Sequence, residues 1–411
     1  VPLLVSGRVL GVLHVGSLTH RTFTEDDTEL LQLAADRAAI TIEHAQLFEQ
    51  RRIAETLQRR LLPDELPAIA GLELAARYLP AAGSSLGGDW YDVFELPGGR
   101  VVLAVGDVVG HGVAAAAVMA QLRTALRAYA IEEHSPGAVV EAVNRMMWDL
   151  GPMVMTTLAY LELDPGSETL EMVLAGHPPP LVVRPGAEPE YLPLQGAMAL
   201  GGSQTARYAA QTVSFPAGTT IVLYTDGLVE RRGESIDAGL DRLRLLVADH
   251  EEPDAICSDV VDHLVADGPT DDVAVVAARL PPLTEDLRTT WPAQAEALVG
   301  VRRLLRRWLA ARGASEDETH DILVASQEAC ANAVEHAYGP GHAHFDVIAE
   351  DLAGTIRITV SDQGRWRAPR GTHRGRGLML MRSLMETVDV DHGTAGTVVV
   401  LERALGARDA A

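Results

Sequence analysis

The sequence predicts a multidomain α+β protein, and three observations lead to this fold class. The length of 411 residues is more than one ordinary core needs, because a domain holds about 150 residues. A long helical pattern over about 27–62 follows a short pair of strands. Short strands dominate over about 68–281, and a mixture of helices and strands follows Pro281-Pro282.

Composition excludes several functions. The net charge of −23 would repel a phosphate backbone, so we expect no nucleic-acid partner. The chain contains no lysine, which excludes a Walker A lysine, a kinase strand lysine and a Schiff base. Cys257 and Cys330 lie far apart and indicate no disulfide framework, so we expect a cytoplasmic location. We expect no membrane span and, because the chain starts at Val1, a piece of a longer protein.

The first half of the chain can be divided by its turn and cap signals. Residues 1–16 read as two short strands around Ser6-Gly7. Thr24 followed by Asp27 resembles a capping box for the long helix, which Pro63 ends. Within the strand-rich region we expect one helix near 113–130 and a second near 136–149.

The last region starts near Trp291 with a helix that stops at Gly313. Ser315 with Glu318 caps the next helix. The strands TIRITVS and GTVVVL follow, separated by an arginine-rich loop and a helix. The apolar face of the first helix consists of Leu298, Val301, Leu305 and Trp308.

Four acidic turns carry the strongest chemical signal. They are GGDWYD (87–92), VGDVVGHG (105–112), YTDGLVE (224–230) and TDDVAVV (270–276). Each places an aspartate beside an apolar run, where a strand end meets a loop. Any one of them is most simply a turn, but the four together favour a site for hard divalent cations. Two such ions can activate a water and clamp an in-line displacement at phosphorus.

These turns resemble the metal-dependent serine/threonine phosphatases (PPM, type 2C), specifically the SpoIIE-like bacterial branch. The resemblance covers about residues 68–281 and extends to AGHPPPL (175–181), LYTDGLVERR (223–232) and LQRRLLPDELP (57–67). It implies an α/β/β/α sandwich. It also implies that Asp89 bridges two Mn²⁺ or Mg²⁺ ions and that Asp107 serves one ion beside the carbonyl of Val108. Asp226 and Asp271 would hold the other ion.

Other residues near these turns have open or structural roles. Asp92 and Asp272 are expected to be solvated or hydrogen-bonded structural acids. His111 could protonate the leaving serine oxygen, but Asp-Val-Val-Gly-His-Gly is longer than the family's Asp-Gly-His, so a second reading without that role stays open. His177 is expected to be structural. A cysteine-based phosphatase is discounted, because Cys257 lacks a phosphate-cradling loop.

The last region contains a second set of candidate site residues. Glu328 and Asn332 lie four residues apart on one helix face. Asp362-Gln363-Gly364 follows a strand, Gly375-Arg376-Gly377 precedes a helix, and Gly396-Thr397 enters the last strand. A carboxylate at a strand end can accept a hydrogen bond from adenine, glycines before a helix free N–H groups for phosphate, and an asparagine oxygen suits Mg²⁺.

As an ordered set these residues resemble the GHKL ATPases, an α/β sandwich, and especially the anti-sigma-factor serine kinases, over about 291–405. The resemblance implies that the site binds ATP. Asn332 would be the Mg²⁺ ligand and Glu328 the base that activates a serine. The remaining implied nucleotide contacts are Asp362 and Gly364 at adenine, Gly375 and Gly377 at phosphate, and Thr397 near the base. Trp366 stands where the family has a glycine. The loop also contains five arginines, which could either bind the triphosphate or face solvent: Arg365, Arg367, Arg370, Arg374 and Arg376.

The first 48 residues resemble the C-terminal part of a GAF sensor domain. Residues 49–67 then read either as a spacer or as a linker helix that dimerises the chain and switches the phosphatase. The chain as a whole is expected to regulate partner switching. The phosphatase would act on a phosphorylated anti-sigma-factor antagonist (STAS domain), and the ATPase domain would phosphorylate the same antagonist. Two alternatives stay open: a non-catalytic C-terminal module that binds the antagonist or a sigma factor, and a degenerate scaffold.

Overall fold

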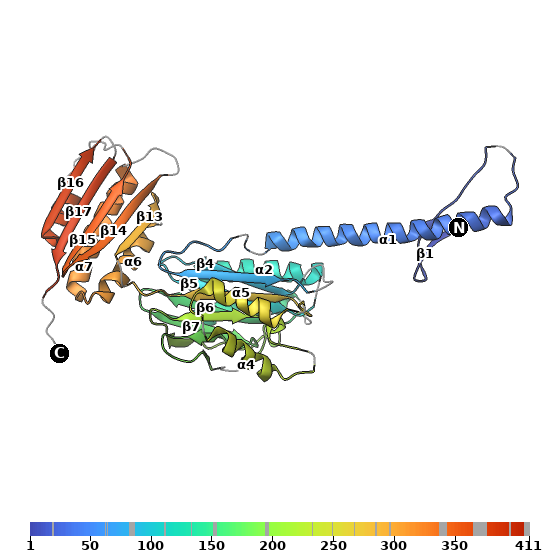
Figure 1. Ribbon diagram of the computed structural model, residues 1–411, viewed down its shortest axis with the longest axis horizontal. Coiled ribbons are helices and arrows are strands. Elements are labelled where there is room, and N and C mark those ends of the chain that lie inside the picture. Colours follow the sequence, from blue (N-terminus) through green and yellow to red (C-terminus); the bar gives the residue numbers. More distant parts are fainter. Residues whose placement is uncertain are drawn as a thin grey trace.

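The computed structural model has an N-terminal hairpin and long helix, a central domain and a C-terminal domain (Figure 1). Its described residues are 1–18, 20–61, 63, 65–81, 87–110, 112–132, 134–150, 154–193, 197–231, 233–248, 250–266, 268–283, 286–295, 297–336, 343–364, 376–393 and 396–406.

The N-terminal part is a hairpin and a helix. β1 (Pro2–Val5) pairs antiparallel with β2 (Arg8–Val12), and the turn between them has positive φ at Ser6 and Gly7. The second strand thus ends before the expected residue 16. The capping box that opens α1 (Glu25–Leu61) is confirmed: the Asp27 N–H donates to Thr24 Oγ1 at 3.2 Å, and the Thr24 N–H donates to Asp27 Oδ2 at 3.0 Å.

The central domain contains two five-stranded sheets. The first has the strand order β10-β7-β6-β5-β4 and the second β3-β12-β11-β8-β9. All pairings within them are antiparallel. The strands of the first sheet are β4 (Asp89–Glu95), β5 (Val101–Val108), β6 (Thr156–Asp164), β7 (Thr169–Ala175) and β10 (Gln211–Ser214). The strands of the second are β3 (Glu73–Leu79), β8 (Leu181–Val183), β9 (Glu190–Tyr191), β11 (Thr220–Tyr224) and β12 (Val273–Arg279).

Four helices cover the outer faces of the two sheets and complete an α/β/β/α sandwich. α2 (Val113–Ile131) and α3 (Pro136–Leu150) share a buried core with the first sheet. α4 (Ile236–Val247) and α5 (Pro253–Leu264) share another with the second sheet. The inner faces of both sheets form a third core, with residues such as Leu103 and Leu223. Burial on both faces explains why strands such as β12 are continuous apolar runs rather than alternating patterns.

The sequence patterns predicted only some of the helices of this domain. The helices near 113–130 and 136–149 are confirmed as α2 and α3, but α4 and α5 were missed. Each of the missed helices has only 12 residues. Their apolar faces are short, so periodicity alone is a weak signal. The cap signals were present: Ser235 accepts the Asp237 N–H, and Pro253 opens α5.

The C-terminal domain is one antiparallel sheet with helices against one face. Its strand order is β13-β14-β15-β17-β16, and α6, α7 and α8 share its apolar core. The expected Ser315–Glu318 capping box is confirmed, because the Glu318 N–H donates to Ser315 Oγ at 3.3 Å and the Ser315 N–H to Glu318 Oε2 at 2.7 Å. The helices are α6 (Ala297–Ala311), α7 (Glu316–His336) and α8 (Arg376–Leu384). The strands are β13 (Leu287–Pro292), β14 (His344–Leu352), β15 (Thr355–Asp362), β16 (Thr387–Gly393) and β17 (Gly396–Ala404).

This domain differs from the sequence expectation at its start. A strand, β13, precedes the first helix and begins at Leu287, before Trp291. The strands β14 and β16 were also not foreseen, because charged residues interrupt their apolar pattern. In the described part of the chain, α1 and the other helices include none that is long and apolar enough to cross a membrane.

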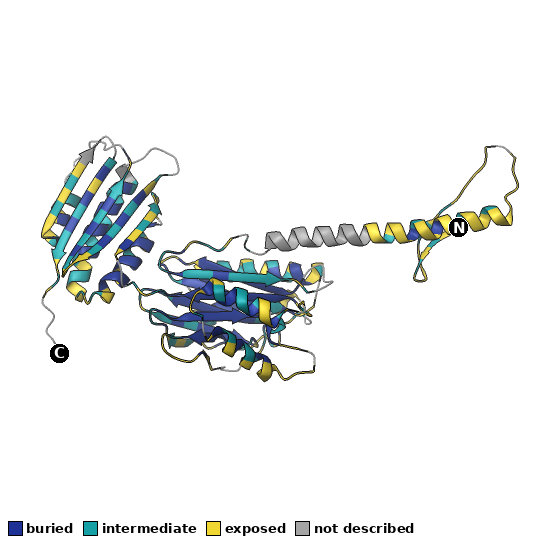
Figure 2. Ribbon diagram, in the orientation of Figure 1, coloured by how far each residue is buried: buried dark blue, intermediate teal, exposed yellow. Residues whose placement is uncertain are grey.

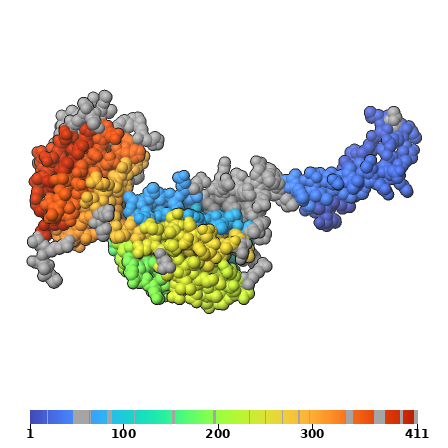
Figure 3. Space-filling model, viewed as in Figure 1, coloured from blue at the N-terminus to red at the C-terminus, as the bar shows by residue number. Residues whose placement is uncertain are grey.

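The exposure of side chains differs between the two domains and the long helix α1. The central strands of the central domain are almost wholly buried, and those of the C-terminal domain alternate buried with half-buried or exposed residues (Figure 2). The described side chains of α1 are mostly exposed. α1 extends away from the central domain on one side, and the C-terminal domain contacts the central domain on another (Figure 3).

Candidate metal centre and nucleotide site

The first pair of acidic residues lies at one end of a hairpin. Asp89 opens β4 and Asp107 is the penultimate residue of β5, and the two are directly opposite in the antiparallel register. Asp89 is only 3% exposed. The backbone here is crowded, because a Cβ at Gly88 would lie 2.1 Å from the Val108 carbonyl oxygen and 2.9 Å from Asp107 Oδ1. Glycine at position 88 therefore lets the chain lie against Asp107 and the Val108 carbonyl.

The second pair of acids comes from the other sheet. Asp226 begins a short 3₁₀ helix (Asp226–Leu228) after β11, and Asp271 lies just before β12. β11 and β12 are antiparallel neighbours, so these two turns meet at the same edge. A Cβ at Gly227 would lie 3.4 Å from the Cβ of Asp271. Asp271 is exposed and Asp226 half-buried, so this pair faces solvent more than Asp89 does.

Electrostatics link the two pairs into one acidic cluster. Burial, reinforced by the negative charge of Asp107, raises the pKa of Asp89 well above its usual range. Burial, followed by repulsion from Asp226, raises the pKa of Asp107 to about 6. The pKa of Asp226 is also raised, by burial and then by Asp271. Carboxylates that destabilise one another in this way are a site that a cation would stabilise.

The donor set fits a hydrated divalent ion. Asp89 Oδ2 is buried and has no hydrogen-bond partner among the described residues, so one carboxylate oxygen is left for a ligand. Within the same described ranges, no three His, Cys, Asp or Glu side chains close into a metal-sized group. Mg²⁺ needs no such cage, since it binds through one or two carboxylates and keeps several waters. Carboxylate and carbonyl oxygens also suit Mn²⁺.

Asp92 and Asp272 have structural contacts, as the sequence suggested for them. Asp92 is fully buried and accepts three hydrogen bonds from α2: from Arg127 Nε and Nη2, both at 2.7 Å, and from Arg123 Nη2 at 3.1 Å. Asp272 is 3% exposed and accepts the Ala81 N–H at 2.8 Å. Asp92 therefore ties α2 to the strand that carries Asp89.

The structure describes His177 but not His111, so only the prediction for His177 can be compared with it. His177 is buried between the sheets, with Nδ1 2.9 Å from Thr157 Oγ1 and Nε2 3.1 Å from the Tyr224 carbonyl oxygen. A carbonyl only accepts, so Nε2 carries the proton. Burial lowers the pKa of His177 to about 4, which keeps it neutral and structural. His111 lies outside the described residues, so its two readings stay open.

Sequence reasoning overlooked Thr225. This threonine is buried, its hydroxyl accepts the Ala274 N–H at 2.9 Å, and a hydrogen bond from Thr225 opposes the raised pKa of Asp89. It therefore connects the two strand ends that carry the acids. Its position directly before Asp226 was the available signal.

The C-terminal domain brings part of the second set of candidate site residues together. Glu328 and Asn332 lie on α7, and Gly377 lies in the first turn of α8. A Cβ at Gly377 would lie 2.6 Å from Glu328 Oε2 and 4.0 Å from Asn332 Nδ2. The N-terminal end of α8 thus approaches both side chains of α7, and its free N–H groups favour negative charge there.

Another part lies at the ends of β15 and β17. Asp362 and Thr397 are register partners, and Asp362 Oδ1 accepts the Gly364 N–H at 2.8 Å. Gly396 has a φ of 135°, and a Cβ there would lie 1.8 Å from the Asp362 carbonyl oxygen. The strand ends can approach this closely only with glycine at position 396. Gly375, Trp366, the loop arginines and the Arg376 side chain lie outside the described residues.

Known family profiles match the three parts of the chain. The profile of stage II sporulation protein E (SpoIIE) matches residues 97–281. That of the histidine kinase-like ATPase domain matches residues 291–403, and that of the GAF domain matches residues 1–43.

Individual relatives match the two larger parts separately. The phosphoserine phosphatase RsbU of Bacillus subtilis is 26% identical over 199 residues, which are 48% of this chain and 58% of that protein. The phosphoserine phosphatase RsbP of the same organism is matched over 38% of its length, so the chain spans about two fifths to three fifths of these relatives. The serine-protein kinase RsbW of Bacillus subtilis is 31% identical over 140 residues, 28% of this chain and 84% of that protein.

One solved structure combines both parts. The RsbU and RsbW domains of Rv1364c from Mycobacterium tuberculosis are 35% identical to this chain. The similarity covers 84% of this chain and 96% of that one, with a TM-score of 0.51. The chain therefore belongs to the family of bacterial regulators in which a SpoIIE-type phosphatase domain of the RsbU kind is fused to a histidine-kinase-like ATPase domain of the RsbW kind.

Proposed function

We propose that the central domain is a metal-dependent protein serine/threonine phosphatase. The observation that carries this proposal is the pair of the buried Asp89 and the half-buried Asp107. Besides burial, the charge of Asp107 raises the pKa of Asp89, and Asp226 and Asp271 raise the pKa of Asp107. Asp89 would bridge two Mn²⁺ or Mg²⁺ ions, Asp107 and the Val108 carbonyl would serve one, and Asp226 and Asp271 the other. Such ions supply an activated water and neutralise charge on the phosphoryl group.

The chain's own residues would position that chemistry. Asp89 and Asp107 are fixed by the strand register, and Thr225 holds the second sheet's turn beside them. The exposed Asp271 leaves the outer side of the cluster open to a phosphoserine on a protein surface. The proposed substrate is a phosphorylated anti-sigma-factor antagonist with a STAS domain, in keeping with the fused kinase-like domain.

The phosphatase proposal is tested by removing one acid. With Mn²⁺, the whole chain should release phosphate from a phosphorylated STAS protein. Asp89→Ala should lower the rate by at least about 100-fold, since a metal-bridging group is lost. A variant that still dephosphorylates at the wild-type rate would sink the proposal.

We propose that the C-terminal domain binds ATP and Mg²⁺ and phosphorylates the same antagonist. Asn332 would bind Mg²⁺, and Glu328 would activate the serine. Asp362, Gly364 and Thr397 would contact adenine, while Gly375 and Gly377 would contact phosphate. A partner-switching pathway of this kind would run inside the cytoplasm, with the chain as a homodimer through its linker helix.

A second candidate is a non-catalytic module that binds the antagonist or a sigma factor. It is favoured by the position of Glu328 Oε2 against the first turn of α8, where a carboxylate can stabilise a helix N-terminus. Phosphate transfer from ATP to a STAS protein separates the two. Transfer that vanishes in Glu328→Ala supports the kinase, whereas no transfer by the wild-type chain supports the binding module.

A further inference from the structure

Helix α6 presents two arginines to the phosphatase domain rather than to water. Arg303 and Arg307 lie one turn apart on one helix face. They are only 8% and 5% exposed, whereas Arg306 between them is exposed. Arginine is rarely buried to this extent without specific partners. This face of α6 is therefore a contact surface between the two domains.

Arg303 contacts the hairpin that carries the acidic pair. Its Nη1 donates to the Gly99 carbonyl and lies 3.0 Å from Glu95 Oε1. Glu95 ends β4, and Gly99 lies in the turn before β5. Asp89 and Asp107 lie at the opposite end of these two strands. Arg303 thus contacts one end of a rigid hairpin whose other end forms the candidate metal centre.

Arg307 contacts the beginning and the end of the phosphatase domain. Its Nη1 donates to the Gly71 carbonyl at 3.0 Å and its Nη2 to the Pro281 carbonyl at 2.7 Å. Gly71 lies in the turn before β3, ten residues after the end of α1 at Leu61, and Pro281 follows β12. The segment that leads out of the long helix is therefore attached directly to α6.

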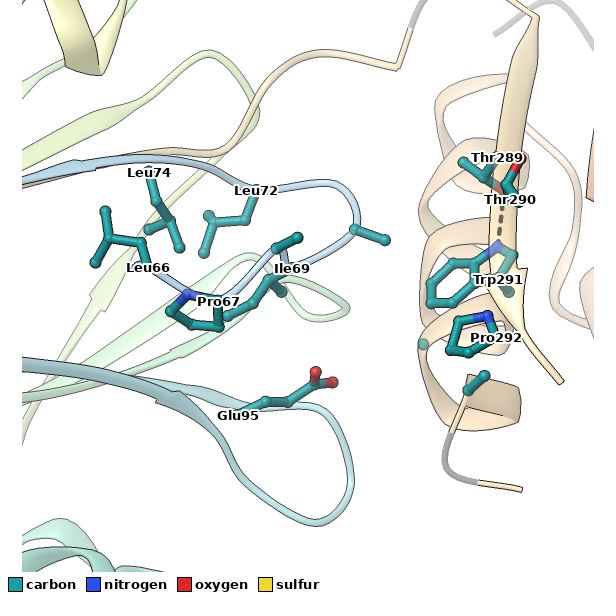
Figure 4. A pocket seen from close by; sticks show the side chains of 14 residues that line it. Leu66, Pro67, Ile69, Leu72, Leu74, Glu95, Thr289, Thr290, Trp291 and Pro292 are labelled. Carbon is teal, nitrogen blue, oxygen red and sulfur yellow. Dashed lines mark hydrogen bonds between the residues drawn. The ribbon is translucent and has the colours of Figure 1, made fainter. Parts of the chain in front are cut away.

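A groove beside these contacts leaves the interface incompletely packed. This groove has a volume of about 740 Å³ and lies between the two domains. Leu66, Pro67 and Ile69 line one side, and Trp291 and Pro292 face them across the gap (Figure 4). Trp291 Nε1 donates to Thr289 Oγ1 at 2.8 Å, which fixes the ring on its own domain. The two domains are held by polar contacts next to open space rather than by a continuous apolar core.

Helix α6 also contacts the nucleotide side of its own domain. Arg302 Nη1 donates to Gln327 Oε1 at 2.7 Å, and Gln327 directly precedes Glu328 on α7. α6 and α7 share the apolar core beneath the sheet, with Leu305 and Ala325 among its members. A shift of α7 would therefore be transmitted to α6, and through Arg303 to the β4–β5 turn.

The cost of burying the two arginine charges would favour an interface whose two domains can separate. Burial lowers the pKa of Arg307, which reflects the loss of water around its charge. The Nε atoms of Arg303 and Arg307 are buried without a hydrogen-bond partner in the described part of the chain. Because buried charges recover their hydration when exposed, such contacts define an orientation more than they add stability.

We propose that α6 couples the two sites, so that nucleotide bound to the C-terminal domain changes the phosphatase rate through Arg303 and Arg307. This inference rests on the proposed function, because both sites must bind their ligands. Nucleotide would shift the equilibrium between two arrangements of the domains. In one, α6 contacts the Gly71 and Gly99 turns as described above, and in the other α6 has moved away from them. Thermodynamic linkage makes the effect on binding reciprocal.

The test uses the whole chain with saturating Mn²⁺ and p-nitrophenyl phosphate, a substrate that needs no protein recognition. Adding ADP should change the wild-type rate by about fivefold or more, which is the usual lower range of allosteric coupling. Arg303→Ala combined with Arg307→Ala should hydrolyse the substrate and bind the fluorescent probe mant-ADP, yet lose the response to ADP. Arg306→Ala, on the exposed face of the same helix, is the matched control and should respond like wild type.

Two results would overturn the coupling: a double variant that responds fully, or a wild-type chain that binds mant-ADP and hydrolyses the substrate without responding. A wild-type chain that shows no hydrolysis or no nucleotide binding would overturn the proposed function as well, so the two failures are distinguishable.

A charge reversal tests the same contact in case the double variant does not fold. Glu95→Arg places two positive charges together at the half-exposed rim and should weaken the ADP response. Adding Arg303→Glu restores an opposite pair and should recover part of the response. If Glu95→Arg responds like wild type, the contact does not carry the coupling.

Discussion

Asp89 and Asp107 face each other across β4 and β5, and the negative charge of Asp107 adds to burial in raising the pKa of Asp89. The pKa of Asp107 is itself raised by burial and by repulsion from Asp226. Like charges held together by a strand register destabilise the fold unless a cation intervenes. The candidate metal centre is therefore a place where function is expected to oppose stability.

Removing one of these charges should stabilise the metal-free protein. We expect Asp107→Asn to raise the melting temperature without metal by about 2–4 °C, the shift for about 1 kcal/mol in a domain of this size. The same variant should gain less from added Mn²⁺, because it has lost a ligand. Calorimetry with and without Mn²⁺ measures both effects. The exposed Asp149→Asn is the control, and a metal-free destabilisation in Asp107→Asn would contradict the repulsion.

The glycine beside this pair should be intolerant of a side chain. We expect Gly88→Ala to lose most Mn²⁺ affinity, because its Cβ would lie 2.1 Å from the Val108 carbonyl oxygen. The backbone would have to shift at the proposed ligands. Isothermal titration of Mn²⁺ checks this, and Gly16→Ala, where the added Cβ meets no atom within 4 Å, is the control. Unchanged Mn²⁺ affinity in Gly88→Ala would place the ions elsewhere.

The buried Asp92 should be important for folding. Asp92→Ala leaves Arg123 and Arg127 without their carboxylate. Because the Arg127 side chain is 43% exposed, we expect a loss below the cost of breaking a fully buried ion pair, which is about 3–5 kcal/mol. Arg127 also lies 4.6 Å from the Phe94 ring centroid, so part of its packing remains. Urea denaturation measures the loss, which Mn²⁺ should not reverse. A loss below about 1 kcal/mol would mean that water replaces the arginine contacts.

His177 should make stability depend on pH in a defined window. Its folded pKa of about 4 lies below the ordinary value of 6.5, so the folded state disfavours the proton. Stability from this residue is complete above pH 6.5 and falls as the pH drops towards 4, by up to about 3 kcal/mol. The raised pKa of Asp107 acts in the opposite direction, so the comparison is with His177→Gln at each pH. Denaturation curves of the two proteins should converge as the pH falls. Parallel curves would contradict the buried neutral imidazole.

The sequence predicted the candidate acids from local patterns, and their role as metal ligands stays a prediction, whereas several elements of the fold were not foreseen. Asp89, Asp107, Asp226 and Asp271 follow from local turns at strand ends, and such turns can be recognised without knowing the sheet order. Asp92 could not be assigned from its neighbours, because its partners Arg123 and Arg127 lie on a helix more than 30 positions away.

The missed elements have a common physical reason. α4 and α5 are short helices whose existence depends on packing against the second sheet, and β14 and β16 are strands whose charged residues face away from the core. The contact of Arg303 with Gly99 was likewise invisible, because nothing in the pattern of α6 distinguishes a buried arginine from an exposed one.

Two opposed activities on one chain can be separated by a two-way assay on one STAS protein. The phosphorylation state of that protein is measured by mass spectrometry after incubation with the chain and Mn²⁺ alone, or with the chain and Mg-ATP. We predict loss of phosphate from the phosphorylated form with Mn²⁺, and gain of phosphate by the unphosphorylated form with Mg-ATP. A phosphorylated STAS protein that keeps its phosphate with Mn²⁺, and an unphosphorylated one that gains none with Mg-ATP, would mean that the chain carries neither proposed activity.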